Sequence, residues 1–181
     1  MKPGGGKAKG SAFEREVCKT LSRWITNGAK DDCFWRSAMS GGRATVAHKA
    51  GKDVRQAGDI TAVASEGHTL CDHFFIECKH VADLDVDSFL IEDIGRLSKF
   101  WKQAITQAAR HQRIPMLIAR ENRRGVLLVS SGPLWNISRC PPLLVRRDGA
   151  SIYDFDALMA TPFLGNDVQR TGIPRLKSIR G

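Results

Sequence analysis

The sequence predicts a single α/β domain in which helices flank a mixed central sheet, followed by a C-terminal extension. Two observations predict this fold class. A chain of 181 residues, of which 42% are hydrophobic and 26% charged, has the size and composition of one globular domain. The apolar periodicity also changes along the chain in the order helix, three strands, helix, two strands. We therefore expect a flexible basic arm at residues 1–10, a core domain at 11–130, and an extension at 131–181 that packs on or near the core.

The first helix is predicted over residues 11–26. Its apolar residues recur three or four positions apart and form one stripe, which contains Phe13, Val17, Leu21 and Trp24. Ser11 and Glu14 have the spacing of a capping box, so we expect the helix to begin at Ser11.

The other elements follow from local patterns. Runs of apolar and β-branched residues predict strands at 33–37, 59–64, 74–79, 115–120 and 125–129. Turn residues near 65–69 are expected to join the second and third of these strands. A second amphipathic helix is predicted over 94–112 and a short one near 153–159. The glycine-rich segment 40–58 and the acidic segment 83–93 are expected to be irregular.

Charge is distributed unevenly in a chain whose formal net charge is +9. Residues 59–93 contain 1 basic and 9 acidic side chains, and both flanking segments are strongly basic. Basic flanks suggest a polyanion such as nucleic acid as partner, although solubility alone would also account for a positive net charge. Carboxylates grouped inside a polyanion-binding protein usually need a cation between them.

Several features bear on location. No apolar run approaches the roughly 18 residues of a membrane span, so no membrane partner is expected. The basic N-terminus is not followed by the apolar stretch of a secretory signal. The odd number of cysteines, 5, favours reduced thiols and a cytoplasmic location.

A possible catalytic group lies in two of the predicted strands. Side chains alternate along a strand, so Glu77 and Lys79 should share a face and Cys78 should point the other way. If the two strands pair as a hairpin, Asp59 reaches the same face. Two carboxylates, the Cys78 carbonyl and waters would form a Mg²⁺ site, and Lys79 could position a water and neutralise charge on phosphate. The alternative is that Glu77 and Lys79 form a solvent-facing ion pair.

Glu14 is a further candidate ligand, because it falls within the apolar arc of the first helix and should face the sheet. The capping box offers Glu14 a structural role that needs no metal, and the two roles are compatible.

Four segments together resemble a known nuclease superfamily. In order they read GSAFEREVCKTL, FWRSAMSGG, AGDI and FFIECKH, over about residues 10–130. This order resembles the PD-(D/E)XK nucleases, and most closely the archaeal-type Holliday junction resolvases and related phage endonucleases. The resemblance implies a restriction-endonuclease-like αβββαβ core. Gly58 stands where the superfamily name places proline.

The resemblance also implies roles for individual residues. Asp59, Glu77 and Lys79 would bind Mg²⁺ and carry out hydrolysis, with Glu14 assisting the metal and Mn²⁺ able to substitute. Arg36 and Ser37 would lie near the scissile phosphate. Further DNA contacts are expected from Lys49, Lys52, Arg55, Lys99, Lys102 and Gln103.

The function predicted is metal-dependent hydrolysis of DNA phosphodiesters, with a Holliday junction as the expected substrate. A resolvase should be a homodimer because it makes two symmetric cuts, and it would act in a bacterial or phage-infected cytoplasm. The alternatives are an exonuclease, a repair or restriction nuclease, and a non-catalytic nucleic-acid-binding relative. A zinc site built from the pairs Cys71/His73 and Cys78/His80 is a weaker alternative, since all four side chains would have to converge.

Overall fold

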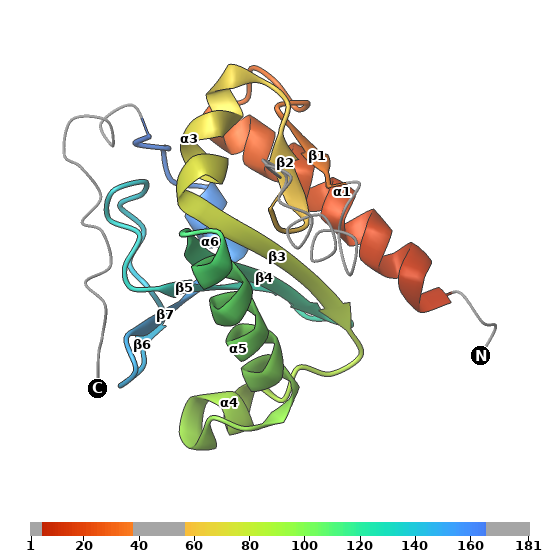
Figure 1. Cartoon of the computed structure of the whole chain (residues 1–181), viewed down its shortest axis with the longest axis vertical. Coiled ribbons are helices and arrows are strands. Elements are labelled where there is room, and N and C mark those ends of the chain that lie inside the picture. Colours follow the sequence, from red (N-terminus) through yellow and green to blue (C-terminus); the bar gives the residue numbers. More distant parts are fainter. Residues whose placement is uncertain (1–4, 38–56, 166–181) are drawn as a thin grey trace.

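A computed structural model describes residues 5–37 and 57–165 of the chain. These residues form a mixed five-stranded sheet with helices on both faces and a separate two-stranded ribbon, which confirms the predicted fold class (Figure 1). In chain order the elements are α1 (Gly5–Ile25), β1 (Phe34–Arg36), β2 (Ile60–Ala62), α3 (Ser65–His73), β3 (Phe74–Val81), α4 (Val86–Glu92), α5 (Gly95–Arg110), β4 (Ile114–Glu121), β5 (Val126–Ser131), β6 (Leu144–Val145), β7 (Ala150–Asp154) and α6 (Phe155–Met159).

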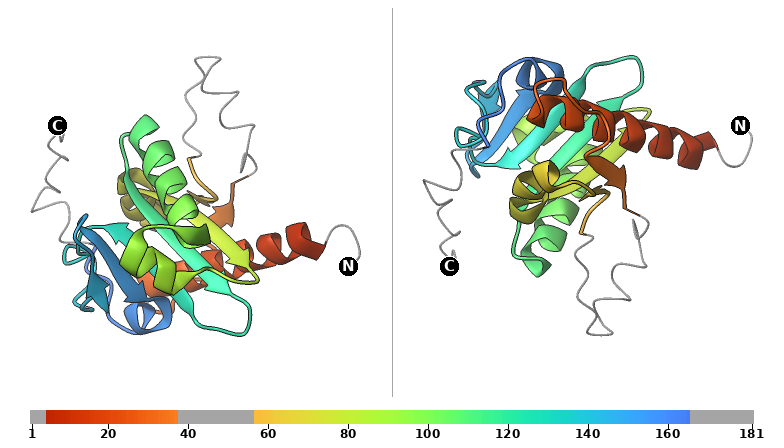
Figure 2. Two further views of the ribbon diagram at one scale, coloured as in Figure 1. Left: turned by 90° about the horizontal axis from the view of Figure 1, so that it is seen from below. Right: turned by 90° about the horizontal axis from the view of Figure 1, so that it is seen from above.

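The five-stranded sheet has the order β3-β4-β5-β7-β6. Strands β3 and β4 are parallel, and the remaining pairs are antiparallel. Helices α1 and α5 lie on opposite faces of this sheet (Figure 2). Strand β3 is therefore an edge strand, and its free edge faces the ribbon of β1 and β2.

The predicted hairpin between residues 59–64 and 74–79 is wrong. Strand β2 pairs with β1, and the chain between β2 and β3 forms α3 instead of a turn. The helix forms because Gly67, Leu70 and Cys71 have helical spacing and are buried together. The ribbon meets β3 through one parallel bridge between Gly58 and Ile76, and a parallel connection needs a crossover of this kind.

Helix α1 buries the predicted stripe but begins earlier than the capping box indicates. It starts at Gly5, so Ser11 lies inside the helix and the capping-box prediction is wrong. Residues 5–10, predicted as part of a flexible arm, are helical. Glycine disfavours a helix by about 1 kcal/mol per residue relative to alanine, but extending an existing helix is far easier than starting one. A hydrogen bond from Lys9 to the Asn122 side chain also holds this end of α1 on the sheet.

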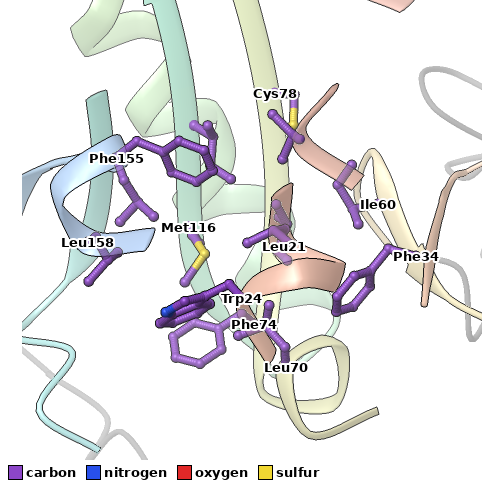
Figure 3. Close-up of a cluster of buried hydrophobic side chains, with 14 of the residues drawn as sticks. Leu21, Trp24, Phe34, Ile60, Leu70, Phe74, Cys78, Met116, Phe155 and Leu158 are labelled. Atoms are coloured by element: carbon purple, nitrogen blue, oxygen red, sulfur yellow. The ribbon is translucent and has the colours of Figure 1, made fainter. Parts of the chain in front are cut away.

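Two apolar layers sandwich the sheet. The layer under α1 joins that helix to β3, β4 and α6, with Leu21, Phe74 and Met116 near its centre (Figure 3). The layer under α5 contains Trp101 and Leu117. All five cysteines are free and buried. Among the helices of residues 5–37 and 57–165, none is long and apolar enough to cross a membrane.

Segment 131–165 belongs to this core. Strand β7 pairs with β5 inside the sheet, although the sequence predicts no strand there. The hydroxyl of Tyr153 is buried and accepts a hydrogen bond from the Leu134 N–H at 2.7 Å. The Trp24 indole of α1 donates to the Thr161 carbonyl, also at 2.7 Å. The short helix predicted near 153–159 is present as α6, with Tyr153 in the preceding strand.

The acidic segment 83–93 is not irregular, as predicted, but contains α4. One buried residue, Phe89, anchors this helix, and its carbonyl accepts a hydrogen bond from Arg146 at 2.5 Å. A single apolar anchor leaves no periodic pattern in the sequence, which is why the helix was not predicted.

We predict that Leu158→Ala lowers the free energy of unfolding by about 2–5 kcal/mol, because it opens a cavity in the core. Leu158 is 0% exposed. The matched control is Leu143→Ala in the same segment, where the side chain is 66% exposed and the expected loss is below about 0.5 kcal/mol. Urea unfolding measures both. Equal, small losses would mean that 131–165 is a separate extension.

Candidate active site

Asp59 lies at the free edge of β3. Its backbone N–H donates to the Ile76 carbonyl at 2.8 Å, and its Oδ2 accepts the Cys78 N–H at 2.8 Å. The carboxylate therefore satisfies a backbone donor at the sheet edge that no neighbouring strand takes. These two bonds, rather than the expected hairpin, bring Asp59 to Glu77 and Lys79.

Gly58 makes this contact sterically allowed. Its φ of +84° lies in the left-handed region, and a Cβ at this position would be 2.4 Å from the Ile76 carbonyl oxygen. A proline, with φ fixed near −65°, could not adopt this conformation. The backbone conformation at this site therefore requires glycine at position 58, where the PD-(D/E)XK motif has proline.

Glu77 and Lys79 share the α5 face of β3, as strand alternation predicts, and Cys78 packs in the opposite layer under α1. The Lys79 ammonium pairs with the Glu77 carboxylate and lies 5.7 Å from the centre of the Phe100 ring on α5. Glu77 is only 7% exposed. The pair is therefore mostly buried, unlike a solvated pair on a strand face.

Burial changes the pKa values of the carboxylates and the ammonium at this site. Burial, followed by the charges of Glu77 and Glu14, raises the pKa of Asp59 to about 7, against the opposing effects of the Cys78 N–H and Lys79. Burial lowers the pKa of Lys79, but the charge and hydrogen bond of Glu77 and the charge of Asp59 outweigh it, so the pKa is raised overall. Lys79 remains an ammonium, and one ammonium faces two buried carboxylates.

The donor set fits a hard divalent cation. Asp59 and Glu77 supply carboxylate oxygens, and the Cys78 carbonyl points to the same edge as the N–H that binds Asp59, since both groups of one strand residue point to the same side. Within the described residues, no three His, Cys, Asp or Glu side chains form a metal cage. Two carboxylates, a carbonyl and several waters are an ordinary set for Mg²⁺.

The zinc alternative finds no support in the described residues. Burial raises the pKa of Cys71 to about 12 and also raises that of Cys78, and both thiols pack in the apolar layer under α1. His73 contacts the Thr69 carbonyl, and the His80 ring packs on Phe13. The four side chains do not converge on one point.

Glu14 and Arg36 border the site from the ribbon side. Arg36 Nε donates to Glu14 Oε2 at 2.5 Å, a pairing that the sequence analysis did not predict. The Glu14 charge acts on Asp59, which places Glu14 near the carboxylates. Ser37 is buried, and its N–H donates to the Asp59 carbonyl at 2.8 Å. The end of β1, at Arg36 and Ser37, therefore lies directly beside Asp59.

Of the other predicted DNA contacts, three lie outside the described residues and three lie on α5. Lys49, Lys52 and Arg55 lie outside the described residues. Lys99, Lys102 and Gln103 are all exposed on α5. At 100° per residue, Gln103 is about 60° from Phe100 around the helix and Lys102 about 160°. Gln103 thus shares the flank of α5 that meets Lys79, whereas Lys102 binds Asp93 at 2.9 Å on another flank.

Phe100 was not identified from the sequence. It lies beside the buried stripe of α5 and not within it, so it contributes nothing to the amphipathic pattern. An aromatic residue next to a core stripe and one turn from Gln103 is nevertheless a detectable signal. Its ring covers the Lys79 ammonium within the roughly 6 Å of a cation–π contact.

A family model matches residues 5–138, and its description is "phage putative PDDEXK endonuclease". The chain belongs to this family. The match includes Glu14, Asp59, Glu77 and Lys79, the residues gathered at the edge of β3. Nucleases of this superfamily generally use divalent metals, in agreement with the oxygen donors of the site. No curated protein and no solved structure matches the chain.

We predict that Asp59→Asn stabilises the metal-free endonuclease. At pH 8 Asp59 is mostly ionised, and a pKa raised from 3.8 to about 7 means that its burial costs free energy. The amide still accepts the Cys78 N–H, so unfolding in chelator should require on the order of 2–4 kcal/mol more. Urea unfolding measures the change.

The same variant should lose the stabilisation that Mg²⁺ gives the parent protein, because a charged ligand is gone. Asp32→Asn, at an exposed loop position, is the control and should change neither quantity. A destabilised Asp59→Asn protein that still responds to Mg²⁺ would contradict the assignment.

Proposed function

We propose that this protein is a Mg²⁺-dependent deoxyribonuclease that cuts branched DNA as a Holliday junction resolvase. One observation carries the proposal. Two buried carboxylates and an ammonium gather at an open sheet edge, and burying this charge has no structural benefit that apolar residues could not supply. Asp59, Glu77 and the Cys78 carbonyl would hold Mg²⁺, with Mn²⁺ as a substitute. The bound ion would supply Lewis-acid stabilisation of phosphate charge and a more acidic water.

Lys79 has the charge state for electrostatic catalysis. Because its pKa is raised, it cannot accept a proton from water near neutral pH. It instead orients the attacking water and stabilises the negative charge that develops on the phosphate. Glu77 and the Phe100 ring hold the ammonium in place, so little reorganisation is needed during the reaction.

The residues around the carboxylates position the substrate. Glu14 would hold an outer water of the metal, and its bond to Arg36 keeps the guanidinium beside the site. Arg36, Ser37 and Gln103 would contact phosphates next to the one that reacts. Lys99 and the predicted contacts Lys49, Lys52 and Arg55 would add to the attraction for DNA.

The branched substrate and a homodimer form the finer part of the proposal. They rest on the resemblance of the motif order to junction resolvases, and on the need for two related active sites to make two symmetric cuts. The alternatives of an exonuclease and of a repair or restriction nuclease use the same chemistry on other DNA. Substrate choice therefore has to be measured.

We predict that the protein with Mg²⁺ cleaves a four-way junction faster than a flap, a linear duplex or a single strand, and that chelator abolishes cleavage. Asp59→Asn and Glu77→Gln should reduce single-turnover rates by orders of magnitude, because each removes a charged ligand. DNA binding should be retained or become tighter, since repulsion of phosphate is relieved. Gel assays with labelled DNA measure both.

The control for substrate choice is a linear duplex with the sequence of one junction arm. Preference for free ends would favour the exonuclease, and full activity in chelator would refute the mechanism. Loss of binding in parallel with cleavage would make the two carboxylates structural.

A second prediction concerns Lys79. Lys79→Gln keeps a hydrogen-bond donor for Glu77 but removes the charge, so turnover should fall at least about 100-fold. Mg²⁺ and DNA binding should change little because every proposed metal ligand remains. Single-turnover cleavage at saturating protein and Mg²⁺ is the measurement.

Lys30→Gln is the matched control, since Lys30 forms an ion pair with Glu66 in which both side chains are exposed. It should cleave at the parent rate. If Lys79→Gln remains within a few-fold of the parent protein, Lys79 is not catalytic.

A further inference from the structure

We propose that a basic hollow at the carboxyl ends of β3 and β4 binds the DNA backbone away from the phosphate that is cut. This inference rests on the proposed DNA substrate. The hollow has a volume of about 580 Å³. Its polar lining consists mainly of Lys9, His80, Arg120, Asn122, Arg123 and Arg124.

Three parts of the fold build the hollow. His80 of β3 and Arg120 of β4 are neighbours in the sheet register. The turn between β4 and β5 supplies Arg123 and the residues beside it. Lys9 comes from the first part of α1 and donates a hydrogen bond to the Asn122 side chain. The first turns of α1, which sequence patterns did not predict, therefore bring a cation to the carboxyl ends of β3 and β4 (Figure 1).

Arg120 is held in place before any ligand binds. Arg120 makes two hydrogen bonds to the Glu16 carboxylate, at 2.7 and 2.6 Å. Its guanidinium carbon lies 4.6 Å from the centre of the Phe13 ring. Phe13 in turn packs edge-on against His80, with ring centres 5.5 Å apart. Such preorganisation lowers the entropy cost of binding.

The charge balance favours an anion. Among the described residues that line the hollow, Asp156 is the one carboxylate. Arg120 and Arg124 are compensated by Glu16 and Glu121. Lys9 and Arg123 have no carboxylate partner within the described part of the chain. A phosphodiester offers acceptor oxygens and one negative charge, which is what these donors require.

The position of the hollow suits a second contact with the same DNA. Glu77 and His80 are three residues apart on β3, which is about 10 Å along a strand. This length corresponds to about three base-pair steps of B-DNA. The two side chains lie on opposite faces of β3, so DNA that contacts both sites would have to pass around the carboxyl end of the strand.

The test is the salt dependence of DNA binding in chelator, measured by fluorescence anisotropy with a labelled duplex. The variant is Lys9→Gln with Arg123→Asn. Glutamine can still donate to Asn122, and asparagine tolerates the positive φ of +63° at Arg123. Each lost phosphate contact should make the log–log slope shallower by about 0.9, and binding at 0.1 M salt should weaken about tenfold or more.

The control removes the same charge elsewhere, by Arg139→Gln with Arg147→Gln, two exposed arginines outside the hollow. It should leave the slope within about 0.3 of the parent value. Equal slopes for the two double variants would overturn the proposal. Thermal melting checks folding, and the single variant Arg123→Asn, at an exposed turn, repeats the test if the double variant melts early.

Failure of this inference is distinguishable from failure of the proposed function, because binding in chelator needs no cleavage. If the parent protein cuts DNA and the double variant binds DNA like the control, the inference about the hollow is refuted and the proposed nuclease function stands. If the parent protein cuts no DNA but the Lys9 and Arg123 double variant loses DNA binding, the inference about the hollow stands and the proposed nuclease function is refuted.

Discussion

The site depends on one backbone contact, the approach of Gly58 and Asp59 to the free edge of β3. An edge strand presents unpaired N–H and C=O groups, and here the Asp59 carboxylate takes the Cys78 N–H while the Asp59 N–H takes the Ile76 carbonyl. The same contact therefore closes part of the edge and fixes a carboxylate beside Glu77. It tolerates no side chain at position 58, because a Cβ there would collide with the backbone of β3.

The layers on the two sides of the sheet stabilise this arrangement, which is unfavourable by itself. Helix α1 packs Cys78 into one layer and brings Glu14 to the edge, whereas α5 covers Lys79 with Phe100 from the other side. Two carboxylates buried next to each other repel, and this repulsion contributes to the raised pKa of Asp59. The apolar layers under both helices offset that cost. Functional sites commonly hold such locally unfavourable features when the surrounding structure fixes them.

The sequence predicts what is local and periodic. Three predictions follow from residue spacing within one element. They are the apolar stripe from Phe13 to Trp24, the helix predicted at 94–112, which is α5, and the alternation of Glu77, Cys78 and Lys79. The pairing of strands does not follow from local spacing, because it is set by tertiary contacts. The strand at 59–64 was expected to pair with the strand at 74–79, but β2 pairs with β1 instead. Tyr153 illustrates the same limit. Its segment runs into a helix, and tertiary contacts make it a strand: the pairing of β7 with β5 and β6 and the hydrogen bond from Leu134.

The two edges of the sheet are under different structural constraints. The proposed function requires strand β3, at one edge, to remain accessible, because the carboxylates beside it would act on DNA. At the other edge, β6 and β7 extend the sheet beyond β5, and α6 fills the layer under α1. The family match ends at residue 138, before β7 begins. The shared part of the chain thus contains the acidic edge, and the part outside the match completes the opposite edge. Residues 139–165 complete the packing of the sheet, whereas Gly58, Asp59 and Glu77 make the arrangement at the edge of β3 on which the proposed chemistry depends.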